Sequence, residues 1–406
     1  MIKKVTLEEI CDINIGKTPK RKEKRYWGKG HPWVTISDID DFFIYKTNEE
    51  VTDAAIKECK MRIVPQNTLL FSYKLTIGKV AITRVPLYTN EAIAALIIKD
   101  ESTTNLKYLY YVLKYSDFRF KTDRAAKGLT LNKQKLKEIK IPLPPFTEQK
   151  QIATVLDIAE GLRRKRQQAI DLLDELLRSI FLDMFGPNAY DYKRWQFIKI
   201  EDLAKPGTNT MRTGPFGSDL LHSEFVDEGI FVVGIDNAVN NRFSWAKKRF
   251  ITKKKYKKLK RYTLYPGDVL VTIMGTLGKS AVVPDDIPLS INSKHLAALT
   301  LNKQKANPYF ISYSIYSDPY ILHQIKKNTR GAIMEGLNLR IIKKLKLKLP
   351  PLNLQNHFET IFKHIEAIKE KMQKSLEEMD NLFHSLMQQA FKGELKFNET
   401  FHKETC

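Results

Sequence analysis

Leu143-Pro144-Pro145, with the long run that follows it to Gly186, decides the fold of this chain because the stretch occurs twice. The second copy begins at Leu349-Pro350-Pro351, 206 positions later, and continues for a similar length. At that same shift Gln149 falls on Gln355. Internal repetition of this kind predicts two copies of one structural unit.

Both runs carry apolar residues spaced alternately three and four apart, which is typical of a helix with a coiled-coil seam. Each run starts just after a Pro-Pro pair, which suits the first turn of a helix. We therefore predict two long helices that pair with each other. The predicted seam comprises Ile152, Val155, Ala159, Leu162, Arg166, Ala169, Leu173, Leu176 and Ile180 in the first helix, and Phe358, Ile361, Ile365, Ile368, Met372, Ser375, Met379, Leu382 and Leu386 in the second.

The rest of the chain predicts two globular domains of the α+β class. In the first half we expect strands at Trp33–Ile36, Thr68–Ser72, Lys79–Arg84 and Ala92–Ile98, and a helix from Leu106. The second half repeats this plan with altered loops. The predicted segments are 1–142 (first globular domain), 143–186 (first long helix), 187–348 (second globular domain), 349–395 (second long helix) and 396–406 (tail).

Composition and charge narrow the class of protein. The chain has 406 residues, 43% of them apolar, which is enough for packed cores. Three scattered cysteines fit a reducing compartment, and no apolar run approaches the length of a membrane span, so we expect a cytoplasmic protein without a membrane partner. The net charge is +22, and the two long runs are each net −1, so the globular halves hold +24. A basic surface of this kind is typical of a polyanion-binding protein.

The basic residues are interleaved with aromatic ones in several loops, which favours contact with DNA, although such runs are also common on solvated surfaces. Residues 247–261, for example, hold ten basic residues in fifteen. The candidate DNA-binding residues are Lys20, Arg21, Lys22, Lys24, Arg25, Tyr26, Trp27, Lys74, Lys79, Arg242, Lys247, Lys248, Arg249, Lys254, Lys279 and Lys294.

Two motifs resemble catalytic elements without completing them. The stretch Gly275–Ser280 lacks the first glycine of a phosphate-binding loop, since position 273 is Ile. Asn307-Pro308-Tyr309-Phe310 lacks the second proline of the Asn-Pro-Pro-Tyr element of amino-methyltransferases, and Pro308 suits the first turn of a helix. Neither the histidines nor the cysteines have metal-ligand spacing. We predict no catalytic and no metal site.

Taken together, these features resemble the specificity subunit of type I restriction–modification systems. The resemblance covers nearly the whole chain. It rests on both Leu-Pro-Pro stretches with Gln149 and Gln355, Gly16-Lys17-Thr18-Pro19, the strand from Trp33 to Asp38, Gly78-Lys79, Gly278-Lys279 and Gln389–Leu395.

This resemblance implies a non-catalytic DNA reader with two target recognition domains, each reading one half of a split duplex target, and two long helices paired as an antiparallel coiled coil. It implies two DNA adenine methyltransferase subunits and two restriction (translocase–nuclease) subunits as partners. No cofactor is expected on this chain, because adenosylmethionine, ATP and magnesium belong to those partners. The alternatives are a subunit serving a fused restriction–methylation enzyme, and a coiled-coil protein scaffold without sequence-specific DNA binding.

A basic patch near the middle of the first long helix suggests one further role. Arg163, Arg164 and Lys165 would lie beside Lys369, Lys371 and Lys374 of the second helix if the two pair antiparallel. We predict that the first three contact phosphates of the spacer between half-sites; a solvated surface or a methyltransferase contact would explain them equally well.

Overall fold

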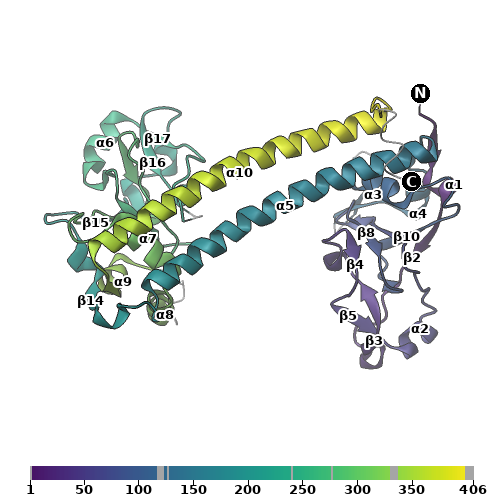
Figure 1. Cartoon of the computed structure of the whole chain (residues 1–406), viewed down its shortest axis with the longest axis horizontal. Helices are drawn as coiled ribbons and strands as arrows, with labels where there is room; N and C mark the ends of the chain where they lie inside the picture. Colours follow the sequence, from purple (N-terminus) through teal and green to yellow (C-terminus); the bar gives the residue numbers. More distant parts are fainter. Residues whose placement is uncertain are drawn as a thin grey trace. The chain divides into compact units, whose positions relative to one another are not determined.

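The computed structural model of the chain describes residues 2–116, 123–125, 128–238, 241–275, 278–329 and 337–397 (Figure 1). The chain divides into two compact units. The first unit comprises residues 1–167 together with 375–406, and the second comprises residues 168–374. Each unit therefore holds one globular domain and a part of both long helices. No helix in the described ranges combines the length and the apolar character needed to cross a membrane.

The first domain is built from short strands and helices. They are β1 (Lys4–Thr6), α1 (Leu7–Ile10), β2 (Cys11–Ile15), η1 (Lys24–Tyr26), β3 (Trp27–Val34), η2 (Ile36–Asp38), β4 (Phe43–Ile44), β5 (Glu49–Val51), α2 (Asp53–Glu58), β6 (Leu69–Ser72), β7 (Lys74–Leu75), β8 (Val80–Thr83), β9 (Tyr88–Thr89), β10 (Ile93–Ile98), α3 (Leu106–Tyr115), β11 (Asp123–Ala125), β12 (Gly128–Thr130), α4 (Lys133–Lys137) and β13 (Lys140–Pro142). The predicted strands at Thr68–Ser72, Lys79–Arg84 and Ala92–Ile98 are confirmed as β6, β8 and β10. The predicted strand at Trp33–Ile36 is only partly confirmed, because β3 ends at Val34 and η2 begins at Ile36.

The second domain follows the same plan. Its elements are η4 (Tyr192–Arg194), β14 (Gln196–Lys199), η5 (Ile200–Leu203), β15 (Met211–Thr213), η6 (Gly217–Asp219), η7 (His222–Glu224), β16 (Ile230–Val233), η8 (Ile235–Asn237), β17 (Phe250–Ile251), α6 (Lys253–Leu259), η9 (Lys260–Tyr262), β18 (Val269–Thr272), β19 (Ser280–Val282), β20 (Ser290–Asn292), β21 (Leu296–Leu299), α7 (Pro308–Ser317), α8 (Pro319–Thr329), α9 (Leu339–Lys344) and β22 (Lys346–Leu349). Pro308 occupies the first turn of α7, as its sequence context predicted.

The repeat extends to the order of strands within the sheets. The first domain has sheets ordered β2-β10-β6-β8-β4 and β5-β3-β9, and the second has β15-β21-β18-β19 and β17-β16-β20. In both domains the middle strand of the small sheet runs parallel to its last strand, β3 with β9 and β16 with β20. The α+β class and the internal repeat are therefore confirmed.

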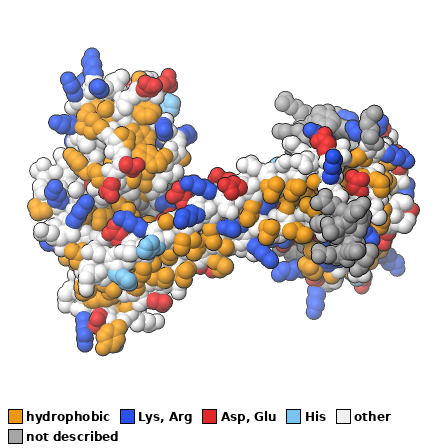
Figure 2. All heavy atoms as spheres, turned by 45° about the horizontal axis from the view of Figure 1, so that its top comes forward, with side chains coloured by type: hydrophobic (Ala, Val, Ile, Leu, Met, Phe, Trp, Pro, Cys, Tyr) orange, Lys and Arg blue, Asp and Glu red, His pale blue; other side chains and the backbone are white. Residues whose placement is uncertain are grey.

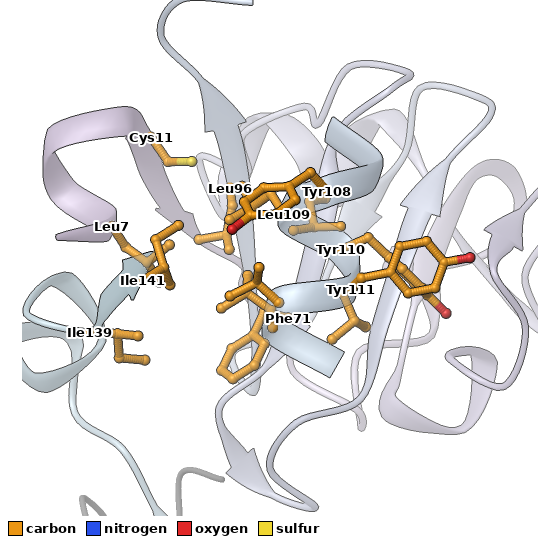
Figure 3. Close-up of a cluster of buried hydrophobic side chains, with 14 of the residues drawn as sticks. Leu7, Cys11, Phe71, Leu96, Tyr108, Leu109, Tyr110, Tyr111, Ile139 and Ile141 are labelled. Carbon is orange, nitrogen blue, oxygen red and sulfur yellow. The ribbon is translucent and has the colours of Figure 1, made fainter. Parts of the chain in front are cut away.

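Each domain packs its larger sheet against one helix and the long helices. In the first unit α3 buries four consecutive aromatic or aliphatic positions from Tyr108 to Tyr111. Figure 3 shows these side chains beside Phe71 and Leu96, which come from the sheet. Phe383 and Met387, from the far end of the second long helix, complete the same core. The globular domain and the helices therefore share one hydrophobic core in the first unit.

The two long helices are α5 (Phe146–Phe185) and α10 (Leu352–Lys392), and they run antiparallel within each unit. In the first unit the Arg163 guanidinium pairs with the Asp380 carboxylate. In the second unit the Phe181 ring lies 5.4 Å from the Phe358 ring. In the first unit the first half of α5 meets the second half of α10, and in the second unit the end of α5 meets the start of α10, as an antiparallel pair requires.

The predicted seam is wrong by one position over the middle of each helix. Leu162 and Leu176 are about half exposed, at 52% and 48%, whereas Ile170 and Leu177 are buried. The seam also contains Arg163 and its repeat, Lys369, which is only 4% exposed. Because charged residues occupy true seam positions, the seam reads as surface in the sequence, and the apolar stripe beside it reads as the seam.

A buried amide ties each long helix to its own domain. The Gln149 side-chain oxygen accepts a hydrogen bond from the backbone N–H of Asn105 at 2.8 Å, and its amide nitrogen donates to the carbonyls of Thr103 and Pro144, both at 2.9 Å. Asn105 in turn caps α3.

Gln355 repeats this arrangement in the second unit. It accepts from the backbone N–H of Asn307 at 2.9 Å and donates to the Pro350 carbonyl at 2.8 Å. Asn307 caps α7 and also donates to the side chain of Asn356, which identifies the Asn-Pro motif as a structural cap.

Replacing Gln149 by glutamate should destabilise the first unit in a pH-dependent way. One carboxylate oxygen would face the carbonyls of Thr103 and Pro144, so burial and repulsion would raise the folded-state pKa of the new group above its unfolded value of about 4.3. The folded state then binds the proton more tightly, and stability falls as pH rises above that value. Thermal unfolding of Gln149→Glu from pH 4 to pH 8 should show a deficit against wild type that grows with pH.

Gln149→Ala separates the loss of hydrogen bonds from the added charge. It should cost about 2–4 kcal/mol at every pH, because buried backbone groups lose their partners. Gln388→Ala removes an exposed glutamine of α10 in the same unit and should leave stability within about 0.5 kcal/mol. A Gln149→Glu deficit that does not change with pH would contradict the assignment.

Candidate nucleic-acid interface

The first candidate loop begins where β2 passes the turn between β9 and β10. A Cβ atom at Gly16 would lie 2.2 Å from the carbonyl oxygen of Thr89, so only glycine fits there. The backbone N–H of Lys17 donates to that same carbonyl at 2.8 Å. In the second domain Gly214 meets the same constraint against Ser293, where its Cβ would lie 2.3 Å from the carbonyl. The Gly-Lys-Thr-Pro and Gly-Pro-Phe-Gly segments therefore start from equivalent places.

The arginines of the first loop stabilise its conformation through contacts with neighbouring side chains. The Arg21 guanidinium lies 4.1 Å from the Trp27 ring and 4.8 Å from the Trp33 ring, and it forms a two-pronged bond with Glu49. Arg25 pairs with Glu58 at 2.8 Å. The stacked, bidentate geometry suits the planar guanidinium of Arg21. Both arginines are paired with carboxylates of the protein, Arg21 with Glu49 and Arg25 with Glu58.

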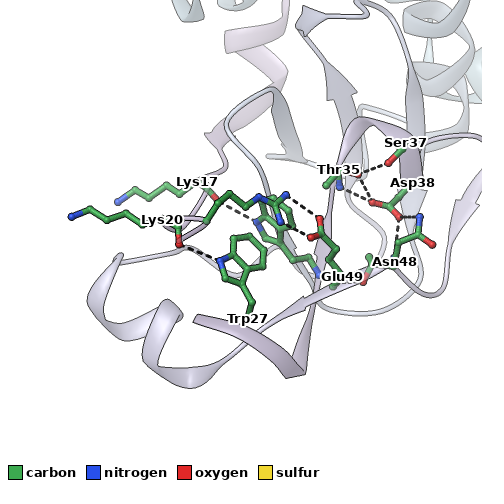
Figure 4. Close-up of polar contacts among 11 residues, drawn as sticks. Lys17, Lys20, Trp27, Thr35, Ser37, Asp38, Asn48 and Glu49 are labelled. Atoms are coloured by element: carbon green, nitrogen blue, oxygen red, sulfur yellow. Dashed lines mark hydrogen bonds and ion pairs between the residues drawn. The ribbon is translucent and has the colours of Figure 1, made fainter. Parts of the chain in front are cut away.

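The two aromatic candidates of this loop are also anchored. Tyr26 is buried and its hydroxyl donates to the Glu58 carboxylate at 2.7 Å, which raises the pKa of the tyrosine. The Trp27 indole N–H donates to the Lys20 carbonyl at 3.2 Å, as Figure 4 shows. The edge of Trp27 stays partly exposed.

The lysines of this loop differ from its arginines. Lys20, Lys22 and Lys24 are exposed and form no ion pair within the described part of the chain. Three ammonium groups on a loop of fixed shape form a mobile positive surface, which suits contact with phosphates.

A second group of polar side chains follows β3. The Asp38 carboxylate accepts from the backbone N–H of Thr35 at 2.7 Å and from the Asn48 side chain at 2.7 Å, as Figure 4 shows. Lys79, a candidate from the sequence, pairs with Asp40 and donates to the Ile36 carbonyl. Lys74 lies half-buried, with its ammonium 5.2 Å from the Tyr73 ring.

In the second domain the lysine-rich stretch is a helix. Thr252 caps α6, and Lys255 turns inward to pair with Glu224. Lys254 is exposed, as are Lys253, Lys257 and Lys258, which the sequence-based prediction did not select. The sequence signal that could have identified them is the helical spacing of these lysines, which are four residues apart and follow Thr252 as a helix cap.

Two further candidates of the second domain, Arg249 and Lys294, lie beside the β20–β21 turn. Arg249 pairs with Asp236, and Lys294 is exposed in the turn itself. His295 was not predicted. Burial lowers the pKa of His295, and Lys294 and Arg249 lower it further, so the imidazole is neutral at neutral pH and can both donate and accept. Lys247 and Lys248 are exposed in the irregular segment before Arg249, where Lys247 lies in a bend.

Two candidates lie elsewhere. Arg242 reaches the long helices, where its guanidinium pairs with Glu366 at 3.0 Å and Asp174 at 3.4 Å. Lys279 is half-buried, with its ammonium 4.8 Å from the Tyr316 ring. Residues 276–277 of its motif lie outside the described residues. DNA contact by Arg242 and Lys279 stays a prediction. In this structure both side chains contact other groups of the protein.

The three predicted spacer contacts on α5 have different environments. Arg163 is bound to Glu160 and Asp380. Arg164 pairs with Asp41 of the first domain at 3.3 Å, and Lys165 is exposed. Their role at the spacer stays a prediction, and of the three only Lys165 forms no ion pair with a described residue. Among the described residues, no cluster of three or more His, Cys, Asp or Glu side chains could hold a metal ion.

Comparison with known proteins identifies the family. The sequence profile of the type I restriction modification DNA specificity domain matches residues 2–172 and 192–378. The MjaIX type I restriction enzyme specificity subunit of Methanocaldococcus jannaschii is 27% identical over 97% of this chain and 93% of its own length. The EcoBI specificity subunit of Escherichia coli is 22% identical over 65% of this chain and 60% of its own.

Two solved structures share the fold. The S subunit of a type I system from M. genitalium has a TM-score of 0.56 and 15% identity, with 98% of this chain and 97% of that chain covered. A chain from a study of assembly and conformational transition of the type I system has a TM-score of 0.59 and 15% identity, with 97% and 98% covered. The family profile matches one half of this chain with each of its two copies, in line with the repeated fold. The chain therefore belongs to the family of type I restriction–modification DNA specificity subunits.

Proposed function

We propose that this specificity subunit recognises a bipartite duplex DNA target and that each recognition domain reads one half-site. The observation that carries the proposal is the division of cations in both domains. Arginines such as Arg21 and Arg249 are fixed by carboxylates, whereas lysines such as Lys20, Lys22 and Lys254 remain exposed and unpaired in the described chain. Rigid loops that carry unpaired cations can hold a duplex by its phosphates while their polar edges face the bases.

The proposal includes partner subunits that perform the chemistry. DNA adenine methyltransferase subunits and restriction subunits would dock on this chain, two of each, and would bring adenosylmethionine, ATP and magnesium. One of the solved structures similar in fold comes from work on assembly of the type I complex.

The surfaces of the long helices support docking of two copies of one partner. Figure 2 shows hydrophobic side chains along these helices. In the first unit Ile158, Leu162 and Leu382 are exposed on the long helices. We call these three residues the first helix patch.

A related group lies in the second unit. Leu172, Leu176 and Ile368 are exposed there, and we call them the second helix patch. At the repeat shift of 206, Leu162 corresponds to Ile368 and Leu176 to Leu382. Each of these two pairs therefore has one residue in the first helix patch and its repeat in the second helix patch. This is expected for two equivalent docking sites.

Mapping of N6-methyladenine across the host genome, with and without this chain, tests the DNA-reading function. A split motif that is methylated in the wild type should lose its methylation when the chain is deleted. The same motif should return when the chain is supplied together with its methyltransferase. A reconstituted complex that methylates DNA without any preferred motif would favour the protein-scaffold alternative.

Neutralising Lys20, Lys22 and Lys24 as glutamines should weaken DNA binding and flatten its salt dependence. Each lost phosphate contact should reduce the slope of log K against log salt by about 0.9, so the triple variant should lose up to about 2.7 without changing its preferred motif. The measurement is a salt titration of binding to the mapped target. Arg21→Lys keeps the charge but loses the stacked two-pronged bond, so it should lower thermal stability with little change of slope.

A charge in one helix patch should remove one methyltransferase copy. Leu162→Glu or Leu176→Glu should each reduce the complex from two copies to one in native mass spectrometry, and the double variant should bind none, because docking would bury the charge without a partner. Gln168→Glu places the same charge at an exposed position of α5 outside both patches and should retain two copies. Full stoichiometry in the double variant would place the docking surface elsewhere.

A further inference from the structure

A cluster of charges occurs once in each unit and joins the recognition domain to both long helices. Its helix members follow the repeat, because Glu160 corresponds to Glu366, Arg163 to Lys369 and Asp174 to Asp380 at the shift of 206. A fourth, cationic member comes from the domain. We call these groups the first and second charge clusters, comprising Lys114, Glu160, Arg163 and Asp380 in the first unit, and Arg242, Glu366, Lys369 and Asp174 in the second.

In the first charge cluster the acid on α5 is bonded from two sides. Lys114 of α3 lies 3.5 Å from the Glu160 carboxylate, and Arg163 bonds that same carboxylate. Arg163 then pairs with Asp380 of α10, and its guanidinium lies 4.6 Å from the Phe383 ring. Glu160 is 17% exposed and Arg163 22% exposed, so water weakens these interactions only in part.

The second charge cluster has the same order with the helices exchanged. Arg242 bonds Glu366 of α10 at 3.0 Å and also reaches Asp174 of α5 at 3.4 Å. The Lys369 side chain is 4% exposed, and its ammonium pairs with Asp174. Burial raises the pKa of Glu366, and Arg242 and Lys369 oppose that rise. Removing Arg242 would therefore leave a partly buried acid with one cation fewer.

The two domains supply their cation from different elements. Lys114 lies in α3, but the matching position in α7 is Ile315, since Tyr115 corresponds to Tyr316. Arg242 comes instead from the segment after η8. The same position beside the helix glutamate is thus filled from two unrelated parts of the domain, which indicates that the contact itself is required.

We propose that the charge clusters orient each recognition domain on the long helices, with Lys114 and Arg242 as positioning residues for the half-sites. A first attachment lies at the helix start, where Gln149 or Gln355 bonds the cap of the domain helix. The shared hydrophobic core holds each domain against the helices, and the charge cluster adds a directional contact further along the helix that fixes the angle of the domain. This inference rests on the proposed reading of a split target.

The space around Arg242 explains why the domain needs this contact with the helices. A cleft of about 1080 Å³ lies between the second domain and the helices in this unit. Its domain side includes Asn241, Trp245 and Lys279, and its helix side includes Glu370 and Gln373. Because this space is not filled by side chains, Arg242 spans it and holds the domain at its distance from the helices.

The test compares targets that differ only in spacing. The full chain in complex with its methyltransferase is measured on duplexes with the mapped half-sites and a spacer that is natural, one base pair shorter or one longer. The wild type should strongly prefer the natural spacer. Arg242→Ala should reduce that preference by up to about tenfold, the size expected when a partly buried acid loses one charged hydrogen-bond partner, while the bases accepted in each half-site stay the same. Lys114→Ala should act in the same way through the first domain.

Matched variants make the outcome specific. Arg178→Ala removes an arginine of the same cleft that forms no ion pair in the described structure, and it should keep the wild-type preference. Arg242→Glu combined with Glu366→Arg rebuilds the pair with reversed charges and should restore the preference. This double variant also tests the inference if a single variant folds poorly. Unchanged spacer preference in Arg242→Ala, or equal loss in Arg178→Ala, overturns the inference. Absence of any split motif in the wild type would instead contradict the proposed function.

Discussion

The buried glutamine amide at the start of each long helix is the interaction on which the rest of the structure depends. Gln149 and Gln355 have no exposed surface, and each satisfies backbone groups of the Pro-Pro segment just before its long helix and of the segment that leads into the domain helix. Unpaired, those groups would be costly to bury. The amide therefore fixes where α3 or α7 lies on the long helix, and the sheet packed on that helix follows. The loops that carry the candidate DNA-binding residues are attached to this sheet and are positioned with it.

The sequence predicted the fold more fully than it predicted the site. The Leu-Pro-Pro repeat, the apolar strands and the helix from Leu106 are local patterns, and local patterns survive into the fold. The seam of the long helices was misplaced because Arg163 and Lys369 occupy it as members of ion pairs. A one-dimensional pattern gives no sign that a charged residue has a partner some two hundred positions away.

The same limit applies to the candidate DNA-binding residues. Composition placed Arg21, Lys22 and Arg242 in one class, since each is a cation in a basic segment. The structure separates them, because Glu49 holds Arg21, Glu366 holds Arg242, and Lys22 has no ion pair among the described residues. His295 escaped prediction because its environment comes from Lys294 and Arg249 together, and only the fold brings the latter beside it. Loop architecture here relies on arginine, and exposed charge relies on lysine, which allows the surface to vary while the loop keeps its shape.

The composition of the first unit bears on how the chain is made. Its core combines Ile152 and Leu156 with Phe383, Met387 and Ala390, whereas the second unit is one continuous segment, residues 168–374. A ribosome delivers all of the second unit before it delivers those last core residues. Until then the first domain exposes the apolar surface that α10 will cover. The entropic cost of closing so long a loop grows only slowly with its length, so the late closure lowers the equilibrium stability of the first unit only a little. In time, however, the part of the chain that is synthesised first is the part that finishes folding last.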